Sequence, residues 1–430
     1  MTTGDSVDGV SRRSFLKRAV AVGGAVGLSA CVEQEGTVDV PRGPEDRSSL
    51  PARQHAWNDV LATDDAGNVL NARHHVLVLL SLPEPGPPTE EMRSTVASAF
   101  GSLERAYARS NRGLLFTVGY SRSYFDRFDD PLPESVDLPH PEPLAPFENP
   151  EMDDADVLVH LASDLPEVVL RAEQALRGNS RRINGVEVTA GVTDVLQSVD
   201  RRTGFVGAGL PAEHTDVADV SEGAIPEEAP FFMGFKSGFE KNQASEDRVT
   251  IESGPFAGGA TEHLSTMSID LEQWYEQDDR YQRVAKMFCP GHAEAGTVEG
   301  VGENLGTSSK MDDCADPKAA AREYGIAGHS QKMLSVREDD SPIILRRDFD
   351  STDGDRPGLH FLALQETIDD FVRTRAAMNG TDVAAETAVG TRTNNGLLQY
   401  IAVHHRGNYL VPPRSLRALP PANPGTEVSQ

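Results

Sequence analysis

The 430-residue sequence contains very little lysine, cysteine and tryptophan. Only seven of its 40 basic residues are Lys, it has three Cys and two Trp, and aromatic residues make up 6% of it. Acidic residues outnumber basic residues by 67 to 40, which gives a formal net charge of −27. A charge of this sign and size excludes nucleic acid as a partner, because the phosphate backbone would be repelled.

The acid excess is spread along the whole chain and is not confined to one tail. Together with the scarcity of lysine, this distribution is typical of a halophilic protein that stays soluble in concentrated salt. An ordinary acidic protein is the alternative. The chain is long enough for two domains with sizeable cores, so we expect a soluble two-domain body.

Two of the three cysteines, Cys289 and Cys314, have neither CxxC spacing nor a nearby His pair with metal-ligand spacing. A zinc site is therefore not expected at these positions. Outside the cell the two residues could form a disulfide, and the sequence leaves that pairing open.

The N-terminal segment has the features of an export signal. Arg12 and Arg13 precede an apolar stretch, residues 19–30, that is too short to span a membrane. The pair resembles the twin-arginine signal, and Leu28-Ser29-Ala30-Cys31 resembles a lipobox, which implies lipidation of Cys31. These resemblances imply transport by the twin-arginine translocase and a lipid-anchored body on the extracytoplasmic face of the membrane. An amphipathic helix with an accidental arginine pair is the alternative.

The body of the chain lies between two segments rich in proline, glycine and polar residues. Residues 32–52 carry no apolar period and are predicted to be a disordered tether after the signal at 1–31. Residues 419–430 are predicted to be a similar tail. Two domains are expected between them, at 53–215 and 216–418.

Apolar periodicity predicts the same order of elements twice. In the first half, strands are predicted at 76–82, 114–120, 157–161 and 192–205, and helices at 89–108, with Thr89 as N-cap, and at 166–176. In the second half, strands are predicted at 265–271, 359–364 and 397–403, and helices at 272–288 and 367–378. This β-α-β, β-α-β order predicts an α+β fold of two tandem ferredoxin-like domains, with helices packed on antiparallel sheets.

Three short segments carry the chemistry. They are Gly234-Phe235-Lys236-Ser237-Gly238, His329 within 325–333, and Ile344-Leu345-Arg346-Arg347. Their order resembles that of the dye-decolourising (DyP-type) haem peroxidase family, which has a Gly-x-x-Asp-Gly motif, a haem-ligating His and then an Ile-Leu-Arg-Arg segment. The resemblance covers about residues 53 to 415. It implies a dimeric α+β barrel, haem b as cofactor, hydrogen peroxide and an organic reductant as substrates, and a homo-oligomer.

The resemblance implies a role for each motif residue. His329 would be the axial ligand of the haem iron, and Arg346 the fixed cation that stabilises charge during peroxide cleavage, with Arg347 as the alternative. Arg suits the second role because its charge is permanent and its donors form a rigid fork. A structural histidine and a solvated strand end are the corresponding alternatives.

Ser237 is the departure from the family pattern, because it stands where the family has Asp. A hydroxyl cannot act as a base near neutral pH, although it can orient a water. Glu240 lies three residues further on and could reach the pocket, or be one more exposed acid. Gly234 and Gly238 suit a tight turn or a close approach to a planar cofactor.

Three functions follow from these residues. The first is an exported DyP-type peroxidase that oxidises organic donors with hydrogen peroxide. The second is a catalytically weak protein of the same fold that binds haem or handles iron from haem. The third is a scaffold of this fold without haem.

Overall fold

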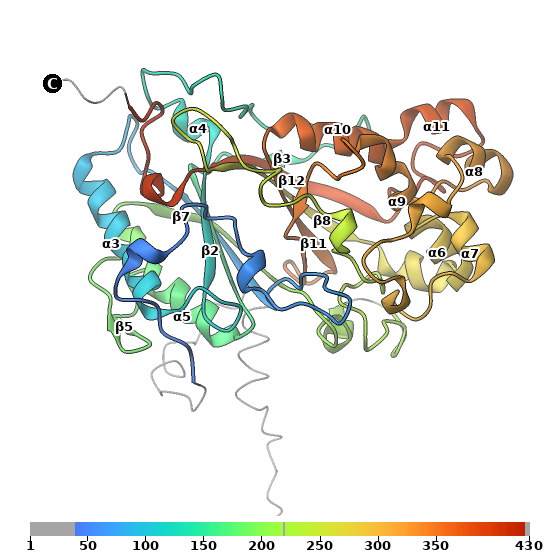
Figure 1. Cartoon of the computed structure of the whole chain (residues 1–430), viewed down its shortest axis with the longest axis horizontal. Coiled ribbons are helices and arrows are strands. Elements are labelled where there is room, and N and C mark those ends of the chain that lie inside the picture. Colours follow the sequence, from blue (N-terminus) through green and yellow to red (C-terminus); the bar gives the residue numbers. More distant parts are fainter. Residues whose placement is uncertain (1–38, 218–219, 426–430) are drawn as a thin grey trace, which may run out of the picture.

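A computed structural model describes residues 39–217 and 220–425 of the chain. Its main feature is a 10-stranded sheet with nine antiparallel strands in the order β10-β7-β1-β4-β2-β12-β8-β11-β9, and with β3 (Glu151–Met152) as a parallel branch on β12. Strand β10 pairs with β7 at one end of this path and also with β11, so the sheet closes into a barrel. Figure 1 shows helices on both sides of this barrel.

The first half of the barrel is a ferredoxin-like unit. Its strands are ordered β7-β1-β4-β2, and α3 and α5 cover their outer face. Thr89 caps α3 as predicted, since its hydroxyl accepts a hydrogen bond from the Met92 amide at 3.3 Å. The elements are β1 (His74–Ser81), α3 (Glu90–Ala106), β2 (Leu115–Ser121), α4 (Arg122–Phe125), β4 (Val157–Ser163), α5 (Pro166–Leu176), a small hairpin of β5 (Arg182–Ile183) and β6 (Val186–Glu187), and β7 (Gln197–Phe205).

The second half repeats this strand order as β12-β8-β11-β9. The predicted α+β fold with two tandem ferredoxin-like units is therefore confirmed. Its elements are β8 (Ala260–Ile269), α6 (Arg280–Met287), α7 (Pro290–Ala295), α8 (Pro317–Tyr324), α9 (His329–Lys332), β9 (Leu345–Arg346), β10 (Phe349–Ser351), β11 (Gly358–Gln365), α10 (Ile368–Asn379), α11 (Thr381–Glu386) and β12 (Ile401–Val411).

The helix predicted at 272–288 is broken in two. A π-helical turn occupies Gln273–Gln277, and α6 starts afresh at Arg280. Asp279 causes the new start, because its carboxylate accepts a hydrogen bond from the Gln282 amide at 2.8 Å while the Gln282 side chain accepts one from the Asp279 amide. This reciprocal capping competes with a continuous helix.

The interior of the barrel is apolar where the two halves meet. Leu77 and Leu79 of β1 contact residues of β8, β10, β11 and β12 there, while the alternate residues of β1 pack under α3 and α5. Strand β10 closes the barrel through the Asp350–Phe205 pairing. The approach is so close that Gly204 has no room for a side chain against the Asp350 carbonyl and the Phe349 ring.

Two predicted disordered segments are packed on the body over part of their length, which corrects their expected boundaries. In the tether, the Pro41 carbonyl accepts a hydrogen bond from the Ala108 amide at 2.8 Å. In the tail, Leu419 and Ala422 are buried. The signal at 1–31 lies outside the described residues. No helix within residues 39–217 and 220–425 has the length and apolar character that crossing a bilayer requires.

Candidate functional site

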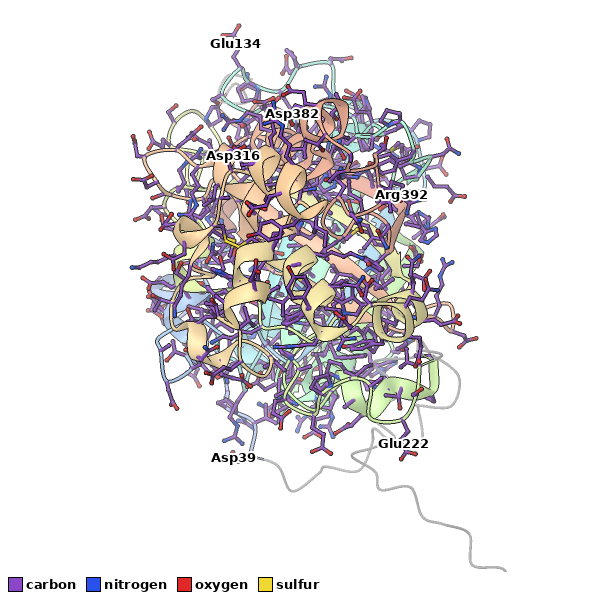
Figure 2. The ribbon with its side chains drawn as sticks, turned by 90° about the vertical axis from the view of Figure 1, so that its right-hand side faces the viewer. Asp39, Glu134, Glu222, Asp316, Asp382 and Arg392 are labelled. Atoms are coloured by element: carbon purple, nitrogen blue, oxygen red, sulfur yellow. A yellow bond between two sulfur atoms is a disulfide. The ribbon has the colours of Figure 1, made fainter. Side chains whose placement is uncertain are left out.

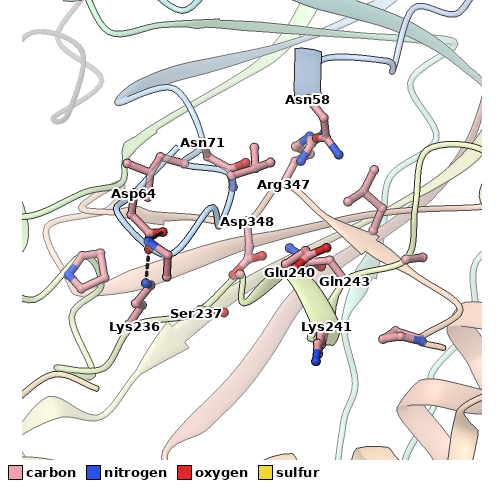
Figure 3. Close-up of a pocket in the computed structure, with 18 of the residues that line it drawn as sticks. Asn58, Asp64, Asn71, Lys236, Ser237, Glu240, Lys241, Gln243, Arg347 and Asp348 are labelled. Carbon is pink, nitrogen blue, oxygen red and sulfur yellow. Dashed lines mark hydrogen bonds and ion pairs between the residues drawn. The ribbon is translucent and has the colours of Figure 1, made fainter. Parts of the chain in front are cut away.

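The two motif segments that flank His329 in the chain meet at one large cavity. Ser237, Gly238, Arg347 and Asp348 line it, and its volume is about 1710 Å³. This volume exceeds the range of about 300–1,000 Å³ that is usual for small-molecule sites, so a group of the size of haem is not excluded by space. Figure 3 labels Ser237, Arg347 and Asp348 in the wall of this cavity.

The glycines at 234 and 238 are both required by the backbone. Their φ angles are 79° and 77°, in the left-handed region that favours glycine. A Cβ at Gly234 would also lie 2.6 Å from the Tyr275 hydroxyl, which donates a hydrogen bond to the Phe232 carbonyl. The segment therefore turns sharply and carries Ser237 into the cavity wall.

Ser237 is half-buried and forms no hydrogen bond to another described residue. Its neighbour Lys236 pairs with Asp64 across the cavity, as the dashed line in Figure 3 marks. Position 237 therefore supplies the cavity wall with a free hydroxyl instead of a carboxylate. Glu240 also lines the cavity, but its side chain is exposed, and only its amide is fixed, by Asn68 at 2.8 Å.

The two arginines of the Ile-Leu-Arg-Arg segment point in different directions. Arg347 is buried and donates to Asn58 at 2.7 Å and to Glu246 at 3.3 Å. Burial lowers the pKa of Arg347 to about 10, and the Glu246 charge opposes this shift. Arg347 is therefore tied to fixed partners in the wall of the cavity.

Arg346 is held less tightly at its guanidinium, whose Nε donates to the Gln243 side-chain oxygen at 3.4 Å. It forms no ion pair with a described residue, and its backbone is clamped by Gln243, whose side chain accepts from the Arg346 amide at 3.0 Å and donates to its carbonyl at 3.3 Å. Arg346 pairs with Ala363, which packs on Phe371 of α10, so the arginine lies on the α10 face of the sheet. Figure 1 shows that α9 lies on this same side.

His329 is the first residue of α9, and its place is set by two glycines. Gly328 has no room for a side chain against the Phe288 carbonyl. Gly396, with a φ of 63°, backs the His329 main chain so closely that a Cβ there would lie 3.1 Å from the His329 Cα. The histidine is held from both sides by backbone contacts.

The imidazole of His329 is half-buried and has no hydrogen-bond partner among the described residues. Its Nδ1 is fully buried and has no partner among the described residues, whereas a metal-ligating histidine usually donates its second ring nitrogen to an acidic or carbonyl group. Burial, together with the positive charges of Lys332, Arg346 and Arg375, lowers the pKa of His329 to about 3. The ring is therefore neutral at physiological pH, which is the form that binds a metal.

His329 and Arg346 do not line the large cavity that Ser237 and Arg347 line. Arg346 nevertheless contributes both to the lowered pKa of His329 and, opposing burial, to the pKa of Asp348. The positive charge of Arg346 therefore acts on both groups.

Sequence reasoning missed two side chains of the site, Gln243 and Glu246, because nothing in the sequence links them to the arginine pair. Asp348 directly follows that pair, where the sequence alone leaves two roles open for an acid, a partner of one arginine or part of an acidic surface. It is buried and lines the cavity, and burial raises the pKa of its carboxyl while Arg346 and Arg347 oppose the rise.

The cysteine pair that the sequence left open is a disulfide between Cys289 and Cys314, seen as a yellow bond in Figure 2. It lies next to the His329 support, because a Cβ at Gly328 would be 3.0 Å from the Cys289 Cα. The other predicted functional residues of the N-terminus, Arg12, Arg13 and Cys31, lie outside the described residues.

The fold places the chain in a known class. It is similar to a putative DyP-type peroxidase from Shewanella oneidensis, with a TM-score of 0.53, 15% identity, and coverage of 80% of this chain and 94% of that one. A dye-decolorizing peroxidase from Bacteroides thetaiotaomicron gives 0.52, 15%, 84% and 99%. A DypB variant from Rhodococcus jostii, solved in complex with heme, gives 0.53, 14%, 85% and 99%. The chain thus has the α+β fold of DyP-type peroxidases.

At the level of sequence, the chain belongs to the family described as "Family of unknown function (DUF7405)", which it matches over residues 72–413. No curated protein matches it.

Proposed function

We propose that this protein binds haem b and acts as a peroxidase that oxidises organic donors with hydrogen peroxide. The observation that carries the proposal is His329, a neutral imidazole without any hydrogen-bond partner among the described residues. Neither ring nitrogen donates or accepts a hydrogen bond with a described residue, so the imidazole is available to a metal and the residue suits a haem ligand.

Haem, when bound, would supply the iron centre that reduces peroxide and then oxidises the organic donor. His329 would hold the iron. Arg346 would stabilise negative charge on the peroxide, because its guanidinium forms no ion pair with a carboxylate of the described residues. Arg347 is the less suitable cation, since Asn58 and Glu246 already hold it.

Support also comes from the fold, which is shared with a DypB variant solved in complex with heme. We further propose that the chain is exported by the twin-arginine translocase and anchored through lipid on Cys31. The motifs around Arg12, Arg13 and Cys31 support this. A homo-oligomer remains a prediction.

Absorption spectroscopy of the protein purified in concentrated salt with haem supplied tests the proposal. We expect a Soret band that His329→Ala abolishes or shifts. His140→Ala is the matched control, because His140 is exposed and pairs only with Asp126 on the surface. Its spectrum should equal that of the wild type. A wild-type protein without a Soret band, or a His329→Ala spectrum equal to the wild type, contradicts the proposal.

A second function is favoured by one observation, the absence of a carboxylate at position 237. If no other group moves the peroxide proton, the protein would bind haem with little turnover and serve in haem or iron handling. Measurement of the bimolecular rate with hydrogen peroxide separates the two functions. A normal Soret band with no detectable reaction would favour the second.

A further inference from the structure

A histidine lies against the disulfide that supports the start of α9. The donor atoms of Cys289, His292 and Cys314 all lie within 4.8 Å of one another. Cys289 and His292 have a Cys-x-x-His spacing at the start of α7, and the disulfide brings Cys314 to them from a loop 22 residues beyond His292. Sulfur and imidazole nitrogen are the ligand atoms that Zn²⁺ prefers in structural sites.

The imidazole of His292 has the orientation and the tautomer of a metal ligand. The ring is buried, and its Nε2 lies 3.0 Å from the Ser309 carbonyl. A carbonyl can only accept, so Nε2 carries the proton and Nδ1 of the neutral ring keeps its lone pair. Ser309 is itself held by Asn242, whose side-chain oxygen accepts from the Ser309 amide at 2.9 Å. A ring N–H donated to a backbone carbonyl is the arrangement that usually orients a histidine toward a metal.

The lone pair of His292 faces a sulfur that has no proton to donate. Nδ1 lies 3.7 Å from the Cys314 Sγ, which is part of the disulfide. In a tetrahedral zinc site with a Zn–N bond of about 2.1 Å and a Zn–S bond of about 2.3 Å, the nitrogen and the sulfur are about 3.6 Å apart. These two atoms therefore already have the separation of two ligands of one ion.

Reduction is the condition under which both cysteines can bind a metal, because the thiolate is the form that acts as a ligand. Cys289 is 1% exposed, whereas Cys314 is half-buried, so a thiol reductant reaches the pair from the Cys314 side. The two cysteines thus have two alternative states beside the same histidine, a disulfide and a pair of thiolates.

We propose that Cys289, His292 and Cys314 form a redox-dependent site for a thiol-binding metal ion of the Zn²⁺ type. A dithiol reductant transfers two electrons and two protons to the disulfide, which becomes two thiols while the dithiol becomes a disulfide. Zn²⁺ then binds both sulfurs and the His292 Nδ1, and the two thiol protons pass to solvent. A water completes the tetrahedron, as in other zinc sites with three protein ligands. The exposed Asp312 and Asp313, next to Cys314, attract the cation.

Zinc content of the full chain tests the proposal, and the measurement does not depend on haem. Reduced protein, incubated with Zn²⁺ and desalted without oxygen, should hold one more Zn²⁺ per chain than oxidised protein. His292→Ala should weaken this binding by about 100-fold or more in competition with a chromophoric chelator, because even the loss of an outer partner of a ligand costs about 10–100-fold. His140→Ala is the control, since His140 is exposed and pairs with Asp126 on the surface.

Single-cysteine variants separate the three-ligand site from binding by any pair of thiols. Cys314→Ser changes one atom of a half-buried side chain and should remove the added Zn²⁺. Cys31→Ser also removes one thiol, and it should bind Zn²⁺ like the wild type. If His292→Ala does not fold, His292→Gln replaces it, because glutamine is close to histidine in size and its amide is not among the usual zinc ligands.

Hydrogen exchange shows whether the ion takes over the support that the disulfide gives. Reduction in the presence of a chelator should speed exchange of the amides of residues 326–332, and Zn²⁺ should slow it again in the wild type but not in His292→Ala. This recovery is expected because the ion joins the same two segments that the disulfide joins.

Three outcomes would overturn the proposal. One is an equal zinc content in reduced and oxidised wild-type protein. Another is an equal zinc affinity of the His292 variant and His140→Ala, since two thiols would then bind the ion without the histidine. The third is an equal loss of zinc in Cys31→Ser and Cys314→Ser. The Soret band that tests the proposed function is measured separately, so either proposal can fail alone.

Discussion

Gly328 lies directly against the carbonyl of Phe288, with no room between them for a side chain. The contact fixes the start of α9, where His329 is the first helical residue. It also couples the candidate haem ligand to the segment that enters the disulfide at Cys289. Two predictions depend on this contact.

Replacing Gly328 should disturb the haem site. Gly328→Ala must push α9 away from Phe288, which moves His329, and overpacking of this kind typically costs about 1–3 kcal/mol. We expect haem affinity to fall about tenfold or more, measured by titration of the Soret band. Gly291→Ala is the control, because the nearest atom to its new Cβ would be the Cys289 Sγ at 3.9 Å. Equal affinities for both variants would show that the contact does not position His329.

Reducing the disulfide should loosen the same support. The backbone N–H of Gln331 in α9 donates to the Phe288 carbonyl at 3.3 Å, and its side-chain amide donates to the Ala315 carbonyl. Gln331 therefore connects the two segments that the disulfide joins. Cys289 and Cys314 are 25 residues apart, and a loop of that size corresponds to about 3 kcal/mol of stability. Denaturant unfolding with and without reductant measures this loss.

Hydrogen exchange locates the effect of that reduction. Amides of residues 326–332 should exchange faster in the reduced protein, because α9 loses one side of its support. The double variant Cys289→Ala, Cys314→Ala is the control, and reductant should not affect it. Faster exchange elsewhere with none in α9 would place the effect of the disulfide outside the haem site.

Glu262 should make the fold less stable as pH rises. It is buried in the barrel, neither carboxylate oxygen has a hydrogen-bond partner among the described residues, and burial raises its pKa to about 8. Between about pH 4.5 and pH 8 the folded chain holds this proton more tightly than the unfolded chain, so stability falls through that window. Glu262→Gln should be more stable than the wild type by a few kcal/mol at about pH 8 and nearly equal to it at about pH 4.5.

Denaturant midpoints of Glu262→Gln and of the wild type, measured between about pH 4.5 and pH 8, check the direction of this stability change. Taking the difference between variant and wild type removes the contribution of the buried histidines, which are shared. Glu240→Gln provides the baseline for an exposed acid. A difference between Glu262→Gln and wild type that does not grow with pH would mean that Glu262 stays protonated or finds a partner.

Low salt should destabilise the body. Acidic side chains such as Glu134 and Glu222 project from its periphery in Figure 2, and the net charge of the chain is −27. Their mutual repulsion is screened in concentrated salt and grows when ionic strength falls to about 10 mM. The melting temperature should rise steadily with salt. The same midpoint in dilute buffer and in near-saturating salt would contradict the halophilic interpretation.

Export should depend on the N-terminal motifs. Replacing Arg12 and Arg13 by Lys should leave the protein in the cytoplasm, and Cys31→Ser should release it from the membrane fraction. Cell fractionation with an antibody to the body measures both. Unchanged distribution of both variants would remove the lipoprotein hypothesis, without bearing on haem.

The sequence by itself determined the repeated β-α-β order, because strand and helix periodicity are local properties of the chain. It also indicated the tight turn at Gly234 and Gly238, because their left-handed φ angles favour glycine. The tertiary structure alone decided how the barrel closes, that Glu246 pairs with Arg347, and that Cys289 meets Cys314. It also brought Asp348 to the wall that carries Ser237. These are relations between distant segments, set by packing and strand register, and no local pattern encodes them.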